Sequence, residues 1–380
     1  MKRWLAAFAV LLALTAAVLG YLEWQARRPW AEWEAFARDF IQDDGRVVDR
    51  TAGGRSVSEA QAYALFFALV ANDRARFERM LAWTRDNLAG GDLRQRLPAW
   101  LWGRRDDGSW GVIDANPASD ADLWLGYVLL EAGRLWQQPA HAELGAAVLD
   151  QVVRQEVVAS AAGTLLLPGP QGFRLPDGRW RLNPSYLPQF QLHYLAQWQP
   201  QGPWRALWST YQALLPQIAP ARLAPDWILL DEQGRVSADT VLPARGGYDA
   251  IRTYLWAGIS AEAGLGREGL TALRGYAALI PEGGAPPEFV DPYAPAARGG
   301  QPLGFSGAVL PYLEALDETT KAREQRQRLE QNRVGGSLGQ PAHYYDQVLA
   351  LFGQGWASGR YRIDSGGRVK PRWEHRCCER

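Results

Sequence analysis

The sequence is short of the residues that most often build metal and redox centres. Its 380 residues include two cysteines and four histidines, and the cysteines, Cys377 and Cys378, are adjacent in the polar stretch RWEHRCCER. Adjacent cysteines cannot staple distant parts of a fold, so the fold must depend on its core. The histidines are scattered and form no HExxH motif. The sequence therefore indicates no metal site and implies no cofactor.

An excess of either charge is also absent. The 41 basic residues balance 41 acidic ones, which leaves no basic field to attract nucleic acid. A GxSxG elbow, a GxxxxGK[ST] loop and a GxGxxG turn after a strand are missing too. Serine-hydrolase, P-loop and dinucleotide-binding chemistries are therefore disfavoured. An apolar content of 47% is ordinary for a globular chain with a sizeable core.

Tryptophan, by contrast, is abundant. The chain has 18 tryptophans and 11 phenylalanines. An indole ring offers a broad apolar face and one N–H donor. Such rings serve either as core or as platforms for sugar rings, and we expect both uses among different tryptophans.

The first residues are typical of a targeting segment. Lys2 and Arg3 precede an apolar run over residues 4–19, which is short for a membrane span but suits a signal peptide. We predict a signal peptide or N-terminal anchor over 1–24, one folded domain over 25–367, and a disordered polar tail over 368–380. The body is then periplasmic or secreted, and it meets a membrane only through the N-terminal segment if that segment is not cleaved.

Hydrophobic periodicity predicts twelve helices and few strands. Short strands are expected in GTLLLPG (163–169) and in a hairpin within DWILLDEQGRV (226–236). The helices are predicted over 30–41, 58–73, 75–88, 118–136, 139–158, 185–198, 203–218, 248–259, 266–280, 306–317, 321–332 and 344–361.

The connections between these helices alternate in length. Short turns after residues 73, 136, 198, 259 and 317 alternate with long loops, and short turns join antiparallel neighbours. If the first helix pairs with the last, the six helical hairpins form an all-α (α/α)6 barrel with a small β-hairpin among its long loops. The helices after long loops are apolar nearly all round, as inner helices should be. All long loops then share one face, where function usually collects.

Carboxylates recur at the starts of these inner helices. Acids in a first turn commonly complement the helix dipole, and each one taken alone favours capping; Ser119 and Asp122 fit a capping box. In a barrel, however, these starts point into one cleft, and a pair of carboxyl groups flanked by aromatic rings is what glycosidic bond cleavage requires. The acids are Glu59, Asp120 with Asp122, Asp249 and Asp346, accompanied by Tyr63, Tyr186, Tyr248, Tyr345, Trp102 and Arg252.

Several stretches resemble a known family in the order in which they occur. ASDADLWLGYVLLEAGRLW (118–136) is similar to the signature of glycoside hydrolase family eight, and SVSEAQAYALFFALVANDRARFERMLAWTRDNL to its catalytic-acid helix. LPAWLWGRRDDGSWGVIDANPASDADLW, LNPSYLPQF, GGYDAIRTYLWAGI and HYYDQVLALFGQGW also match. The resemblance covers nearly the whole chain after the N-terminal segment. It implies an (α/α)6 barrel and is strongest to the periplasmic endoglucanases associated with bacterial cellulose synthase.

The resemblance also implies roles for individual residues. Glu59 matches the general acid and Asp249 the general base of an inverting mechanism, which places a water between them and predicts a carboxyl separation of about 6.5–9.5 Å. Asp120 matches the signature aspartate, which binds and distorts the sugar beside the scissile bond, and this leaves capping to Asp122. The residues expected to position substrate and water are Trp102, Tyr186, Tyr248, Arg252 and Tyr345.

The implied activity is that of an inverting endo-β-1,4-glucanase that needs no metal. Its expected partners are cellulose chains and the cellulose synthase export machinery. Family-eight activity on chitosan, xylan or mixed-linkage glucan is an alternative, as is an inactive glucan-binding partner of the synthase.

Overall fold

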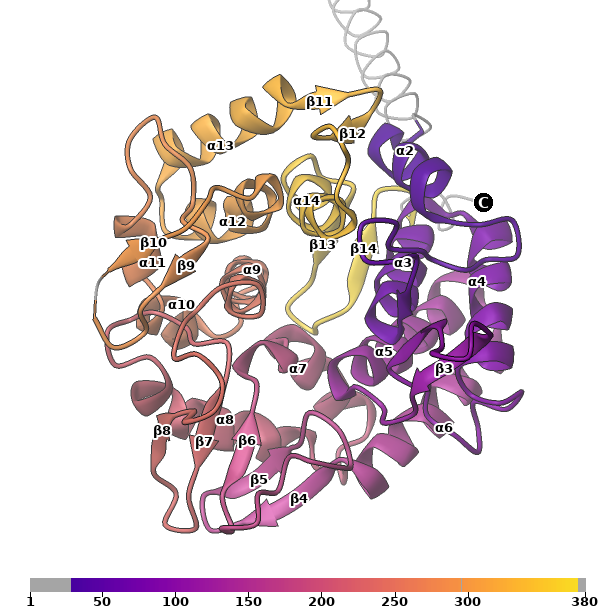
Figure 1. Ribbon diagram of the computed structural model, residues 1–380, viewed down its shortest axis with the longest axis horizontal. Coiled ribbons are helices and arrows are strands. Elements are labelled where there is room, and N and C mark those ends of the chain that lie inside the picture. The colour runs from indigo at the N-terminus through magenta and orange to yellow at the C-terminus, as the bar shows by residue number, and fades with distance from the viewer. Residues whose placement is uncertain (1–28, 295, 375–380) are drawn as a thin grey trace, which may run out of the picture.

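Six helices form a ring at the centre of the computed structural model, which describes residues 29–294 and 296–374 (Figure 1). Successive inner helices lie side by side around the ring, and the last, in yellow, returns to the first, in indigo. The inner helices are α3 (Ser58–Ala71), α5 (Ser119–Trp136), α7 (Gln189–Trp198), α9 (Ala250–Glu262), α12 (Leu303–Ala315) and α14 (Tyr344–Ala357).

Each inner helix packs against an outer partner. The outer helices are α2 (Ala31–Phe40), α4 (Arg74–Asn87), α6 (Pro139–Gln155), α8 (Trp204–Ile218), α10 (Arg267–Ala272) followed by α11 (Gly275–Ala278), and α13 (Thr319–Gln331). Helix α2 contacts α14, so the first outer helix does pair with the last inner one. The predicted (α/α)6 arrangement is confirmed.

Burial separates the two layers as their sequences predict. Nearly every residue of α3 is buried, whereas the charged α13 buries only Ala322, Gln325 and Leu329. Inner helices are enclosed on all sides, while outer helices keep one face in water. Two predicted helices differ in detail. The segment 266–280 is divided into α10 and α11, and the segment 185–198 begins with the 3-10 turn η1 (Pro184–Tyr186) before Pro188 at the start of α7.

Trp124 of α5 is at the centre of the core. Its ring contacts Phe66 of α3 at 5.1 Å between centroids, Phe352 of α14 at 5.1 Å and Trp256 of α9 at 5.3 Å. Four inner helices therefore meet around one indole. Several tryptophans thus serve the core, as aromatic rings with large apolar area do.

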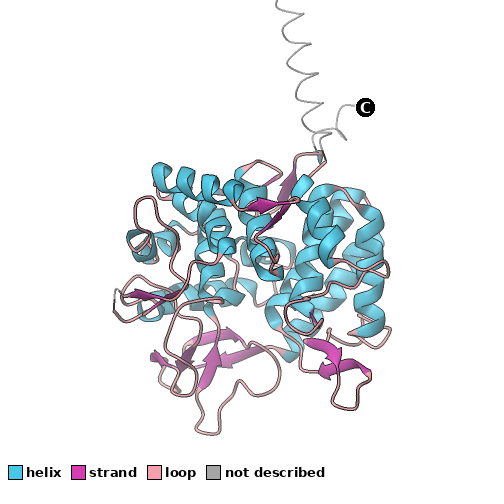
Figure 2. Ribbon diagram, turned by 45° about the horizontal axis from the view of Figure 1, so that its top comes forward, coloured by secondary structure: helices cyan, strands magenta, loops and turns pink. Residues whose placement is uncertain are grey.

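The strands lie beyond the helix ends in small sheets (Figure 2). The predicted hairpin within 226–236 is present as β7 (Ile228–Leu230) and β8 (Val236–Ala238), with Ile228 opposite Ala238, and β6 (Trp180–Leu182) extends it. Antiparallel β1 (Ser56–Val57), β2 (Leu101–Arg104) and β3 (Trp110–Asp114) form a second three-stranded sheet. The remaining strands pair in twos: β4 (Val157–Ser160) with β5 (Gly163–Leu166), β9 (Phe289–Val290) with β10 (Ala297–Arg298), β11 (Arg333–Val334) with β12 (Ser337–Leu338), and β13 (Tyr361–Ile363) with β14 (Val369–Pro371).

Residues 368–374 are folded, which corrects the prediction of a disordered tail for this part of 368–380. Val369 donates its backbone N–H to the buried carboxylate of Glu131 at 2.8 Å, and Arg134 pairs with both Glu131 (2.6 Å) and Glu374 (2.8 Å). The indole of Trp373 donates to the carbonyl of Leu69. The sequence missed this because a short polar segment can be ordered by partners far away in the chain.

Two predictions fall wholly or partly outside the described residues. The N-terminal segment over 1–24 and the remainder of the tail, with Cys377 and Cys378, lie there. Within residues 29–294 and 296–374, every helix is too short or too polar to span a bilayer.

Candidate active site

Two of the predicted carboxylates, Asp120 and Asp249, come together through one cation. Arg252, in the first turn of α9, places Nη2 3.0 Å from Oδ1 of Asp249 and 3.4 Å from Oδ2 of Asp120. The side chain of Asp120 is 2% exposed and that of Asp249 is 29% exposed. The arginine therefore links a buried acid to one that solvent can reach.

Glu59 is in the first turn of α3, where an indole contacts it. The Nε1 atom of Trp100 donates to Oε1 of Glu59 at 3.3 Å, and the hydroxyl of Ser58 donates to Oε2 at 3.4 Å. Burial, followed by the charge of Asp120, raises the pKa of Glu59 to about 8. Glu59 is therefore protonated at neutral pH, as a general acid must be.

Asp120 is held on several sides at the start of α5. Its Oδ1 accepts from the backbone N–H of Ala121 at 2.8 Å, and its Oδ2 accepts from the hydroxyl of Tyr63 at 3.4 Å. Burial raises the pKa of Asp120 to about 6, while Arg252 opposes that rise. A carboxylate fixed in this way suits binding a sugar hydroxyl.

Arg252 is itself held by residues from two other elements, η1 and α14. Its Nη2 donates to the hydroxyl of Ser185 at 2.9 Å, its Nη1 donates to the hydroxyl of Tyr345 at 3.5 Å, and its guanidinium is 5.6 Å from the ring centre of Tyr186. The phenol of Tyr345 in turn donates to the carbonyl of Tyr248 at 2.7 Å. The structure thus brings Arg252, Tyr186 and Tyr345 to the carboxylates.

Tyr248 is at the rim of this group. Its side chain is half exposed, and its hydroxyl donates to Glu288 at 2.9 Å. Its ring packs edge-on against Phe305 and Phe289. The backbone of Tyr248 therefore contacts the site directly, while its half-exposed ring packs beside it.

The predicted capping roles are wrong. Val57 and Ala118 occupy the N-cap positions of α3 and α5, and neither side chain can accept a hydrogen bond. Ser119 and Asp122 therefore form no capping box. The sequence pattern was misleading because both helices begin one residue earlier than a serine cap would require.

Asp122 instead faces a second buried acid. Its carboxyl group lies close to that of Glu156, just beyond α6, and both residues are completely buried. Within the described residues, none of their four carboxyl oxygens has a hydrogen-bond partner. Burial raises the pKa of each carboxyl well above its ordinary value. Asp122 thus belongs to a pair of buried carboxyl groups with raised pKa values.

Asp346, the remaining predicted acid, lies apart from the linked carboxylates. It is in the first turn of α14, where its Oδ1 accepts from the backbone N–H of Gly304 at 2.7 Å. This hydrogen bond links the first turn of α12 to the first turn of α14. Its role is therefore structural.

Aromatic rings line a cavity of about 250 Å³ next to Glu59. Trp227 stacks on Phe173 with centroids 6.0 Å apart and planes 2° apart, and Tyr186 meets Trp227 edge-on. Flat apolar faces of this kind can stack on pyranose rings. Polar groups at the walls come from Asp114, Asn116 and Arg181, and the indole of Trp100 joins the cavity to the acid.

Trp102 is placed differently from the prediction. Its ring stacks on Trp110 at 5.4 Å, meets Trp83 edge-on, and lies under the guanidinium of Arg46 at 4.0 Å. The structure does not bring it to the carboxylates. Trp100 provides the indole beside Glu59, and the motif LPAWLWG alone could not show which tryptophan would do so.

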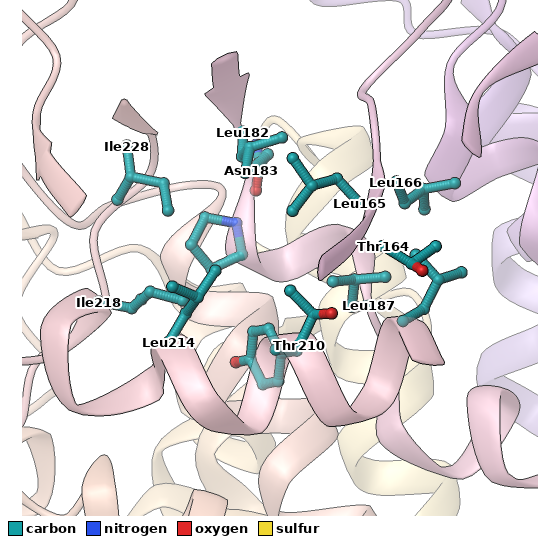
Figure 3. Close-up of a pocket in the computed structure, with 13 residues that line it drawn as sticks. Thr164, Leu165, Leu166, Leu182, Asn183, Leu187, Thr210, Leu214, Ile218 and Ile228 are labelled. Atoms are coloured by element: carbon teal, nitrogen blue, oxygen red, sulfur yellow. The ribbon is translucent and has the colours of Figure 1, made fainter. Parts of the chain in front are cut away.

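A second cavity is small and apolar. It lies between α8 and strands β5, β6 and β7, and it is walled largely by leucine and isoleucine (Figure 3). Its volume of about 30 Å³ admits a water molecule or two but no sugar. We assign it to core packing. Within residues 29–294 and 296–374, no group of three or more His, Cys, Asp or Glu is placed to hold a metal ion.

The arrangement offers the parts of a two-carboxylate hydrolysis. Glu59 carries a proton near neutrality, and Asp249 is reachable by water. Asp120 raises the pKa of Glu59, and Arg252 contacts both Asp120 and Asp249. An acid, a base and a stacking platform for sugar rings are the requirements for cleaving a glycosidic bond.

Comparison with known proteins agrees with this chemistry. A family model described as glycosyl hydrolases family 8 matches residues 8–359. An endoglucanase of Xanthomonas axonopodis pv. citri is 45% identical over 353 residues, which are 92% of this chain and 91% of that protein. An endoglucanase of Escherichia coli K12 is 40% identical and covers 96% of this chain and 97% of its own length.

Solved structures give the same result. An endo-1,4-D-glucanase from Vibrio fischeri ES114 superimposes with a TM-score of 0.84 at 37% identity, and the match covers 90% of this chain and 99% of that one. The endo-β-1,4-glucanase CMCax from Acetobacter xylinum gives a TM-score of 0.68 at 26% identity, covering 85% and 95%. With its ring of helical hairpins and its linked carboxylates, the chain belongs to glycosyl hydrolases family 8.

Proposed function

We propose that this chain is an inverting endo-β-1,4-glucanase that cleaves cellulose chains. The observation that carries the proposal is the pairing of a carboxyl whose pKa is raised to about 8, Glu59, with a solvent-reachable carboxylate, Asp249, through Asp120 and Arg252. The naming of the similar proteins as endoglucanases supports β-1,4-glucan as the substrate.

The mechanism proposed is a single displacement. Glu59 gives its proton to the glycosidic oxygen as the bond to C1 breaks. A water on the opposite face of the ring attacks C1 and loses a proton to Asp249. Arg252 holds Asp249 in place, and Asp120, steadied by Tyr63 and Arg252, binds the sugar beside the scissile bond.

The cavity next to Glu59 provides the binding surface in this proposal. Trp227, Phe173 and Tyr186 stack on sugar rings on one side of the cleavage point, and Tyr248 meets the chain at the rim. A face of uncharged aromatic rings suits a neutral glucan better than a polycationic chitosan.

Two substitutions test the assigned roles. We expect Glu59→Gln and Asp249→Asn each to lower hydrolysis of a cello-oligosaccharide by about 10²–10⁴-fold while binding is retained, because each removes one proton-transfer group. Asp346→Asn, an acid on the same face but outside the linked group, serves as the control. Full activity in either test variant would remove the corresponding role.

The products decide between the alternatives. Proton NMR of the first product released from a cello-oligosaccharide should show the α-anomer, whereas retention would give the β-anomer. The same protein should be assayed on chitosan, xylan and mixed-linkage glucan. A preference for one of these would replace the substrate assignment, and inactivity on all with binding to cellulose would indicate a glucan-binding partner.

The cellular setting proposed is export, with action on glucan during bacterial cellulose synthesis beside the synthase export machinery. This part rests on the N-terminal sequence, in which Lys2 and Arg3 precede the apolar run over 4–19. Mass spectrometry of the protein from a periplasmic fraction tests it. A mature chain beginning near residue 25 would support a signal peptide, an intact N-terminus in the membrane fraction would support an anchor, and an intact chain confined to the cytoplasm would contradict export.

A further inference from the structure

The start of α9 is capped by a carboxylate from a distant part of the chain. The Oδ1 atom of Asp226, just before β7, accepts from the backbone N–H groups of Gly247 (2.7 Å), Asp249 (3.1 Å) and Ala250 (2.9 Å). Asp226 is buried, with 6% of its surface exposed. One oxygen therefore satisfies three donors around the peptide that carries Asp249.

Asp249 occupies the N-cap position of this helix but does not cap it. Aspartate is among the preferred N-cap residues, because its side chain can accept from the free N–H groups of the first turn. Among the contacts of the described residues, the carboxylate of Asp249 instead contacts Arg252 at 3.0 Å. Asp226 does the capping, which leaves the carboxylate of Asp249 free to face solvent and substrate.

The segment before Asp249 is built for this close approach. Gly246 exchanges two backbone hydrogen bonds with Val290, at 2.9 and 2.8 Å. A Cβ atom on Gly246 would lie 2.1 Å from the carbonyl oxygen of Ala224, and one on Gly247 would lie 2.7 Å from the ring of Phe289. Gly246 therefore allows the segment that carries Asp226 to lie against the start of α9, and Gly247 allows Phe289 to approach the same peptide.

The charge of Asp226 is partly balanced where it lies. The guanidinium of Arg245 is 3.7 Å from Oδ2, and the backbone N–H of Asp226 donates to the carbonyl of Arg245 at 2.8 Å. Burial, then the charge of Asp249, raises the pKa of Asp226 to about 6. The group is therefore largely ionised at neutral pH.

We propose that Asp226 is a positioning residue for the general base: its carboxylate fixes the peptide of residues 247–250 and so sets where the Asp249 carboxylate meets the attacking water. This inference rests on the proposed function, in which Asp249 is that base. It assigns Asp226 no contact with substrate. Its effect should therefore fall on turnover rather than on binding.

Three variants at this position separate the hydrogen-bond acceptor from the charge. Asp226→Ala removes the acceptor. We expect kcat on a cello-oligosaccharide to fall by about 10–10²-fold, since a small displacement of a catalytic group has an effect of this size. KM and oligosaccharide binding should change by less than about twofold. Asp226→Asn keeps an acceptor oxygen and should retain most of kcat. Asp226→Glu keeps the charge but moves the oxygen, so kcat should fall; this variant carries the test if the alanine variant does not fold.

Asp73→Ala is the matched control. Asp73 caps the outer helix α4 by accepting from the backbone N–H of Arg76 at 3.1 Å. We expect this variant to lose thermal stability, as a capping loss does, with kcat unchanged. A folded Asp226→Ala protein with wild-type kcat, or an Asp226→Asn protein as impaired as Asp226→Ala, would overturn the proposal. An active Asp249→Asn protein would instead remove the base assignment itself, so the two failures can be told apart.

Discussion

The raised pKa of Glu59 should set the alkaline limit of activity. With a pKa of about 8, about 90% of Glu59 is protonated at pH 7 and about 10% at pH 9. A glutamic acid at the ordinary value of 4.5 would be protonated in only about 0.3% of molecules at pH 7. The surroundings of Glu59 therefore increase the acid-competent fraction by about 300-fold.

The charge of Asp120 contributes to that increase, second to burial. Asp120→Asn removes a negative charge that disfavours ionisation of Glu59, and Arg252, which favours it, remains. We therefore expect the alkaline limb of the pH–rate profile to move to lower pH in this variant, even though its overall rate is reduced. Asp346→Asn changes an acid at the start of α14 that is not among the main causes of the raised pKa of Glu59, and the alkaline limb of this variant should stay in place.

The assay is kcat/KM for a neutral cello-oligosaccharide between pH 5 and pH 10, because the carboxyl groups of carboxymethylcellulose would add their own charge effects. The wild-type alkaline limb should fall about tenfold per pH unit above about pH 8. Two results would refute the account of Glu59. One is a wild-type kcat/KM that already begins to fall below pH 6 on the alkaline side, and the other is an alkaline limb in Asp120→Asn at the same pH as in the wild-type protein.

Three further outcomes follow from the contacts described. The native Asp122–Glu156 pair holds protons that the unfolded chain loses above its ordinary carboxyl pKa, so the free energy of unfolding should decline as pH rises, by up to about 1.4 kcal/mol per pH unit for each proton retained. Asp122→Asn should make that decline less steep in urea melts from pH 5 to 9, and a decline as steep as that of the wild-type protein would contradict the pairing. Glu131→Ala breaks the buried ion pair with Arg134 and the hydrogen bond from the backbone N–H of Val369, and it should lower the free energy of unfolding by about 3–5 kcal/mol. A loss below about 1 kcal/mol would contradict the importance of Glu131 in holding the C-terminal segment. Trp227→Ala should weaken oligosaccharide binding by about tenfold in calorimetry, or about 1.4 kcal/mol, through lost stacking; unchanged affinity would remove Trp227 from the binding surface.

The architecture was predictable because it depends on local patterns. The alternation of short and long loops can be read directly from the sequence, and so can the helices that are apolar on all sides. Together they imply paired helices in a ring. The convergence of Asp120, Asp249 and Arg252 followed from that ring, since inner helix starts share one face.

What was missed depends on contacts between segments far apart in sequence. Asp226 reaches α9 across a hairpin, and its sequence setting, DWILLDEQGRV, indicates only a turn between strands. Trp100 and Trp102 have the same spacing signal, yet it is Trp100, just before β2, that contacts Glu59, and the register of β2 is irregular between Leu101 and Trp102. Asp122 matched a capping box, yet its carboxyl pairs with Glu156, which no local pattern could indicate.

The way the ring closes has a consequence for folding. Trp373 bonds to Leu69 across 304 residues, and Phe352 packs against Phe67 at 4.6 Å. Contacts of such long sequence separation form late, because the intervening chain must lose entropy first. While residues beyond about 340 are still on the ribosome, α3 and α5 lack their contacts with α14, and the apolar surface around Phe67 and Trp124 that Phe352 covers stays exposed. Ring closure therefore has to wait for the last inner helix, α14, and until it occurs the chain remains a substrate for chaperones and for any machinery that handles unfolded polypeptide.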